Sequence, residues 1–138
     1  MNKIVLITGA TAGIGKACAI KFAAEKFDVI ITGRRNERLL QLKTKLEKEY
    51  AVEVLTLCFD VQDKHAVANA ISSLPQRWQK IDTLINNAGL ALGRDSFEDA
   101  DMNDWETMLN SNVHGLLYVS KAVLPFMLAQ KKGHIVNM

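Results

Sequence analysis

Residues 4–15 read IVLITGATAGIG, and this stretch decides the fold. Ile4 to Thr8 is apolar up to its last residue, which is typical of a parallel strand buried on both faces. Glycines follow at positions 9, 13 and 15, and from Ile14 onward the apolar residues fall at helical spacing. The stretch therefore predicts a strand, a glycine-rich turn and a helix that begins directly at the turn.

The same alternation of short apolar runs and helical patterns continues along the chain. With helices between them, four further strands are expected at residues 29–32, 54–59, 83–85 and 134–138. Asn36 and Asp63 are candidate N-caps of the second and third helices. With right-handed crossovers, this order predicts an α/β fold, a doubly wound parallel sheet of order 3-2-1-4-5 truncated at strand five.

A long amphipathic stretch from about Asp104 to Gln130 precedes the fifth strand, and Pro125 is expected to kink or interrupt it. Helical spacing predicts that its buried face is made by five apolar side chains: Met108, Leu109, Val113, Leu116 and Leu117.

The composition indicates one soluble globular domain over residues 1–138. The formal net charge of +2 is too small to favour nucleic acid or a membrane surface, so the expected partner is a small molecule. The two cysteines, Cys18 and Cys58, have no metal-ligand spacing and are expected to be free, buried thiols; no metal site is expected. The N-terminal apolar run is too short for a signal peptide, which favours a cytoplasmic protein.

The glycine turn, TGATAGIG at residues 8–15, differs from the pattern G-x-G-x-x-G but meets similar physical demands. One glycine allows a sharp turn, another allows the backbone to approach a pyrophosphate, and the helix N-terminus offers free amides to the anion. We interpret the turn as a dinucleotide-binding site; the alternative is a tight strand-to-helix turn with no ligand.

Two arginines, Arg34 and Arg35, follow the second predicted strand in the sequence ITGRRNER. NAD-binding proteins usually place a carboxylate there for the ribose 2′-hydroxyl, whereas guanidinium groups suit a 2′-phosphate. The pair therefore favours NADP over NAD. The alternative is two solvated arginines before a helix, and Glu37 lies close enough to complicate the prediction.

Three segments together resemble the short-chain dehydrogenase/reductase family: TGATAGIG, NNAG at residues 86–89 and NVHG at residues 112–115. The resemblance runs the whole length of the chain and implies a Rossmann-like fold with a nicotinamide cofactor lying across the sheet. It also implies a homo-oligomer, with a tetramer suggested. Residues 1–138 would then be a dinucleotide-binding domain without its C-terminal catalytic segment.

The resemblance implies roles for individual residues. The diphosphate would be surrounded by Gly9, Ala10, Thr11, Ala12, Gly13 and Ile14, and the 2′-phosphate would be bound by Arg34 and Arg35. Asp60 and Val61 would flank the adenine, and Asn87 and Gly89 would lie beside the ribose. Gly15 and Ala88 are further cofactor-binding residues by the same resemblance. Two local alternatives remain open: Asp60 can simply cap the next turn, and Asn87 can brace neighbouring strands.

Asn112 is the one catalytic residue that the resemblance implies in this chain, through a water or a proton-relay lysine. The alternative is a buried asparagine bonded to backbone. The family's reaction also uses a serine and a Tyr-x-x-x-Lys pair. Neither Tyr50 nor Tyr118 has lysine four residues later, so the 138-residue chain alone is expected to be inactive.

A narrower resemblance links ITGRRNERL, NNAGLALG and DWETM to the NADP-dependent branch that oxidises 3-hydroxy acids such as serine and allo-threonine. It implies hydride transfer between nicotinamide and a hydroxyl-bearing carbon in the full-length protein. Two other functions remain open, a non-catalytic NADP(H)-binding module or sensor and a structural or partner-binding protein without a cofactor.

Overall fold

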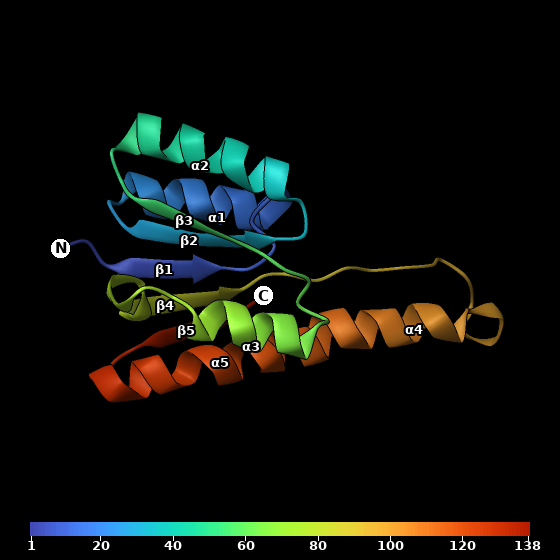
Figure 1. Ribbon diagram of the computed structural model, residues 1–138. Helices are drawn as coiled ribbons and strands as arrows, with labels where there is room; N and C mark the ends of the chain where they lie inside the picture. Colours follow the sequence, from blue (N-terminus) through green and yellow to red (C-terminus); the bar gives the residue numbers. More distant parts are fainter.

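A computed structural model describes residues 1–138 as a five-stranded parallel sheet with helices on both faces (Figure 1). Its strand order is β3-β2-β1-β4-β5, which confirms the predicted order. The strands are β1 (Ile4–Ile7), β2 (Asp28–Gly33), β3 (Val54–Cys58), β4 (Ile81–Asn86) and β5 (His134–Asn137).

The chain has five α-helices: α1 (Gly13–Ala24), α2 (Asn36–Tyr50), α3 (Lys64–Ser72), α4 (Met102–Leu109) and α5 (Gly115–Gln130). Helices α1 and α2 cover one face, whereas α3 and α5 cover the other (Figure 1). Short 3₁₀ helices lie at Gln76–Gln79 and Phe97–Asp99, and a π-helical segment, Asn110–His114, joins α4 to α5. None of these helices is both long enough and apolar enough to span a membrane.

Two apolar cores lie on opposite faces of the sheet, because successive side chains of a strand point to opposite sides. In β1, Val5 and Ile7 belong to the core under α1 and α2. Ile4 and Leu6 belong to the core against α3 and α5. All four residues of β1 are buried, which explains why the strand is apolar throughout instead of alternating.

The predicted helix N-caps have different outcomes. Asp63 caps α3 as predicted, with its Oδ1 accepting hydrogen bonds from the backbone amides of His65 and Ala66 at 3.1 and 3.0 Å. The prediction for Asn36 is wrong, because Asn36 is already the first residue of α2 and Arg35 is its N-cap. The backbone stays extended through Arg35, whose side chain makes no capping bond. The guanidinium of Arg35 is therefore not used to cap α2.

The predicted buried face of the long helical stretch is wrong at three positions. Leu109, Val113 and Leu117 are exposed by 56%, 45% and 54%, while Met108 and Leu116 are only half-buried. The buried positions are instead spaced by four residues: Ser111, Gly115, Val119, Val123 and Met127.

The physical reason lies in the π-helical segment Asn110–His114, which alters the helical register between α4 and α5. The long helical stretch is interrupted at this segment and not at Pro125, which lies inside a continuous α5. Small residues face inward because the helix comes close to the chain after β3. A Cβ added to Gly115 would lie 2.7 Å from Cγ2 of Val61.

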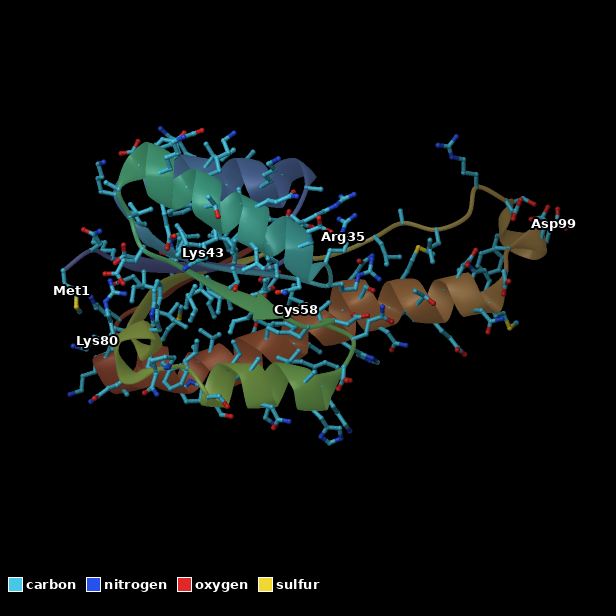
Figure 2. The ribbon with its side chains drawn as sticks, turned by 45° about the horizontal axis from the view of Figure 1, so that its top comes forward. Met1, Arg35, Lys43, Cys58, Lys80 and Asp99 are labelled. Carbon is cyan, nitrogen blue, oxygen red and sulfur yellow. The ribbon has the colours of Figure 1, made fainter.

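The outer strand β3 is bonded to α2 through two side chains of that helix, Lys43 and Glu47, which also form an ion pair with each other. Nζ of Lys43 lies 2.9 Å from Oε1 of Glu47 and also donates a hydrogen bond to the carbonyl oxygen of Val54. Glu47 accepts from the amide of Val54 at 3.2 Å. Figure 2 shows Lys43 on the side of α2 that faces β3. Both backbone polar groups of Val54 are thus satisfied by side chains of a neighbouring helix.

Both cysteines are free, as expected, but the predicted burial is wrong for Cys58. Cys58 is exposed because it ends the outer strand β3, while Cys18 on α1 is half-buried. No group of three or more histidine, cysteine or acidic side chains is arranged to hold a metal ion.

Candidate functional site

A cleft of about 360 Å³ lies where β1, β2, β3 and β4 end. Figure 2 shows Arg35 and Cys58 toward this end of the strands, with Met1 and Lys80 at the opposite end. The cleft is lined by Gly9, Thr11–Ile14, Thr32–Arg35, Phe59–Gln62, Asn87–Leu90 and Ser111. Parallel strands bring these segments together, and such a strand end is where open α/β sheets bind ligands.

Every predicted cofactor-binding residue except Ala10 and Gly15 lines the cleft. Ala10 is fully buried, and its amide donates to the carbonyl oxygen of Thr32 at 3.0 Å. Gly15 is buried in the first turn of α1. Sequence reasoning missed six lining residues: Thr32, Gly33, Phe59, Gln62, Leu90 and Ser111. All of these except Ser111 lie beside the predicted residues at the ends of strands. Their position just before or after a strand end was the signal by which they could have been found.

The N-terminus of α1 opens into the cleft without a side-chain cap. Ala12 is its N-cap, and no side chain bonds to the first-turn amides. Helices α3 and α4 differ, because Asp63 and Asp101 cap them. Free amides and the positive end of a helix dipole make a site for an anion. The start of α1 is therefore suited to a diphosphate group.

The three glycines of the turn serve different needs. Gly9 has φ +63°, and a Cβ there would lie 2.9 Å from Cα of Ala88. A Cβ on Gly15 would lie 2.3 Å from the carbonyl oxygen of Gly9. Gly13 has φ +55° but open space around it. Close packing requires glycine at positions 9 and 15, whereas backbone conformation alone favours it at position 13.

Thr8 and Asn87 connect the turn to the chain after β4. The hydroxyl of Thr8 accepts from the amides of Asn87 and Ala88 at 3.0 and 2.9 Å. The Nδ2 group of Asn87 donates to the carbonyl oxygens of Thr8 and Gly9, both at 3.1 Å. Asn87 therefore braces the two segments, which the sequence left open, and its Oδ1 remains as the group that can meet a ligand.

Arg34 and Arg35 are exposed at the outer end of the cleft. Nη2 of Arg35 donates to Oγ1 of Thr11 at 3.0 Å. The guanidinium of Arg34 makes no bond to the chain, and Glu37 forms no ion pair with either arginine. The two positive charges thus remain available to an anionic ligand.

Asp60 contributes one oxygen to local structure, because its Oδ1 accepts from the amide of Gln62 at 3.0 Å. This is the turn-capping alternative of the sequence. The second oxygen makes no bond to the chain, so Asp60 still presents an acceptor to the cleft that it lines with Val61.

Asn112 lies in the π-helical segment and is exposed, but it does not line the cleft. Its Oδ1 accepts from the amide of Leu90 and its Nδ2 donates to the carbonyl oxygen of Leu90, both at 2.8 Å. A Cβ on Gly89 would lie 2.8 Å from that Oδ1. Asn112 therefore clasps the segment that forms one wall of the cleft.

Two curated relatives match this chain over nearly all of its length. It is 47% identical to an NADP-dependent 3-hydroxy acid dehydrogenase of Salmonella typhi over 135 residues, which are 98% of this chain and 53% of the relative. It is 45% identical to sulfoacetaldehyde reductase 2 of Chromohalobacter salexigens over 139 residues, which are 100% of this chain and 54% of the relative. The chain thus spans about half the length of the curated relatives it matches.

Solved structures share the architecture. A closed form of serine dehydrogenase complexed with NADP⁺ has a TM-score of 0.86 and 45% identity over 96% of this chain and 52% of that one. NAD⁺-bound xylitol dehydrogenase has a TM-score of 0.92 and 32% identity over 98% of this chain and 52% of that one.

The profile of the short chain dehydrogenase family matches residues 3–138. With the strand order, the capless α1 and the N-x-x-G clasp already described, this match leaves one conclusion: the chain belongs to the short chain dehydrogenase family.

Proposed function

We propose that this chain is the cofactor-binding domain, residues 1–138, of an NADP-dependent oxidoreductase. One observation carries the proposal: Arg34 and Arg35 lie at the outer end of the cleft, and neither forms an ion pair with a carboxylate of the chain. A 2′-phosphate would meet two guanidinium groups there, and guanidinium binds phosphate through paired, charge-assisted hydrogen bonds. The NADP-dependent relative supports the same cofactor.

Each part of the cleft has a proposed role. Gly9 and residues 11–14 at the start of α1 bind the diphosphate, Arg34 and Arg35 bind the 2′-phosphate, Asp60 and Val61 flank the adenine, and residues 87–89 lie beside the ribose. When bound, the nicotinamide supplies the hydride acceptor or donor of the reaction. The chain's own residues orient it and hold its charges.

Asn112 stays a predicted participant in the proton relay. Its side chain is bonded at both ends to Leu90, which supports a positioning role: it holds the cleft wall that follows Gly89. The acid/base and substrate-orienting groups implied by the family resemblance are proposed for the whole protein, together with a homo-oligomeric state and a cytoplasmic location.

For the whole protein we propose a small acidic substrate. Relatives of 47% and 45% identity are named for 3-hydroxy acids and for sulfoacetaldehyde. In both compounds the carbon that bears oxygen is separated by one carbon from an anionic acid group. The shared chemistry supports hydride transfer at a carbon in the β position to a carboxylate or a sulfonate.

The test uses the intact natural protein in two steps. Dissociation constants for NADPH and NADH are measured first, by the fluorescence of the reduced nicotinamide, and NADPH should bind far more tightly. Oxidation of 3-hydroxypropanoate and 2-hydroxyethanesulfonate by NADP⁺ is then followed by absorbance, with 2-hydroxypropanoate as the control. Tight NADPH binding without turnover of any substrate would favour a non-catalytic module, and equal binding of the two cofactors would refute the NADP assignment.

A further inference from the structure

The neighbouring arginines of the cleft are held in different ways. Arg35 donates from Nη2 to the hydroxyl of Thr11 at 3.0 Å, although the two residues are 24 positions apart. Arg34 has no bond from its guanidinium; only its backbone oxygen is contacted, by Sγ of Cys58 at 3.6 Å. The chain therefore orients one guanidinium and leaves the other unrestrained.

Thr11 is itself held in place by the end of β2. A Cβ added to Gly33 would lie 2.8 Å from Cγ2 of Thr11, so the threonine methyl occupies the space that glycine leaves open. The adjacent amide of Ala10 donates to the carbonyl oxygen of Thr32 at 3.0 Å. The methyl of Thr11 is packed over Gly33, and the preceding residue, Ala10, is bonded to β2. The direction of the Thr11 hydroxyl is therefore fixed.

We propose that Thr11 is a positioning residue that holds Arg35 in the orientation needed for the cofactor's 2′-phosphate, with Gly33 providing the space for it. The inference rests on the proposed function. A guanidinium has five N–H donors, so one bond to Thr11 leaves the others for phosphate oxygens. A long exposed side chain otherwise loses rotamer freedom on binding, and an existing restraint reduces that loss. Thr11 thereby contributes to the preference for NADP without itself contacting the 2′-phosphate.

The experiment measures the ratio of the dissociation constants for NADH and NADPH in the intact natural protein. Thr11→Val keeps the methyl over Gly33 and removes the hydroxyl, and should lower this ratio about fivefold, as expected for one lost hydrogen bond. Thr11→Ser keeps the hydroxyl and should stay within about twofold of the original ratio. Thermal unfolding confirms that each variant is folded.

Two further variants make the test specific. Thr44→Val is the matched control, because Thr44 is exposed on α2 and its hydroxyl bonds within its own helix to the Leu40 carbonyl oxygen at 3.0 Å. Its ratio should not change. In an Arg35→Ala background, Thr11→Val should lower the ratio no further, because the hydroxyl acts through the arginine.

Several results would overturn the inference. An unchanged ratio in Thr11→Val would remove the role of Thr11, and a full additional loss in the Arg35→Ala background would assign the hydroxyl to the phosphate directly. The failure of the proposed function has a different signature, since the unaltered protein would then show no preference for NADPH.

Discussion

The two halves of the cleft are built in opposite ways. The glycine half, Gly9 to Gly15 with Thr8 and Asn87, is internally hydrogen-bonded and closely packed at Gly9 and Gly15. The arginine half, Arg34 and Arg35, is exposed, and its two guanidinium groups make a single bond to the chain, from Arg35 to Thr11. The first half suits the diphosphate that all nicotinamide dinucleotides share, and the second suits the phosphate by which they differ. We therefore expect changes in the first to affect folding and all cofactor binding, and changes in the second to affect cofactor choice.

The largest effect is expected for Gly15→Ala in the glycine half. The added methyl would lie 2.3 Å from the Gly9 carbonyl oxygen and 2.4 Å from Nδ2 of Asn87, so the turn must move. The free energy of unfolding should fall by about 3 kcal/mol, near the upper end for overpacking. Both cofactors should lose affinity, measured by denaturant unfolding and by fluorescence titration. A stable variant with normal binding would contradict the close packing of this half.

Replacing both arginines by alanine should come next, with an effect on binding alone. NADPH affinity should fall by about 100-fold, because two charge-assisted hydrogen-bonding groups are lost. NADH affinity and the melting temperature should change little, since both side chains are exposed. Titration with each cofactor and thermal unfolding check this. Equal losses for the two cofactors would mean that the halves are not separate in function.

Thr8→Val should destabilise the fold by about 2 kcal/mol. The hydroxyl of Thr8 is buried and accepts two amide hydrogens, which valine would leave without a partner. Thr8→Ser preserves the acceptor and serves as the control in denaturant unfolding. If serine destabilises the fold and valine does not, the methyl contact and not the hydroxyl holds the segment after β4.

The smallest effect is expected for Gly13→Ala, the counterpart of Gly15→Ala. Apart from the adjacent backbone, no atom lies within 4 Å of the added methyl, so only the left-handed conformation at φ +55° opposes it. That conformation costs about 1 kcal/mol for alanine. Unfolding measurements on the two variants together separate the steric requirement from the conformational one. A larger loss at Gly13 than at Gly15 would reverse the assignment made for the two glycines.

Most of the fold could be predicted because its signals are local. Buried strands such as Ile4–Ile7 are continuous apolar runs, and the turn glycines mark the start of α1. The side chains at the strand ends were also predictable, since parallel strands bring their carboxyl ends together. Arg34, Asp60 and Asn87 line one cleft for this reason.

The remainder depended on contacts that no local pattern records. Ser111 and Gly115 are buried because a π-helical segment redirects the helix and Gly115 approaches Val61, whereas hydrophobicity favoured Leu109 and Leu117. Asn36 missed the N-cap by one residue because the backbone enters the helix after Arg35. The clasp between Asn112 and Leu90 joins residues 22 positions apart, so its partner was not readable from the motif.

The bonds that join Lys43 and Glu47 to Val54 also bear on association between molecules through the outer strand β3. An edge strand with free amides and carbonyls can template the addition of a strand from another molecule. At Val54 both groups already have partners supplied by α2. The helix therefore does more than cover one face of the sheet: it closes part of the edge against cross-β pairing, and variants lacking this ion pair would expose a point at which amyloid-like association can begin.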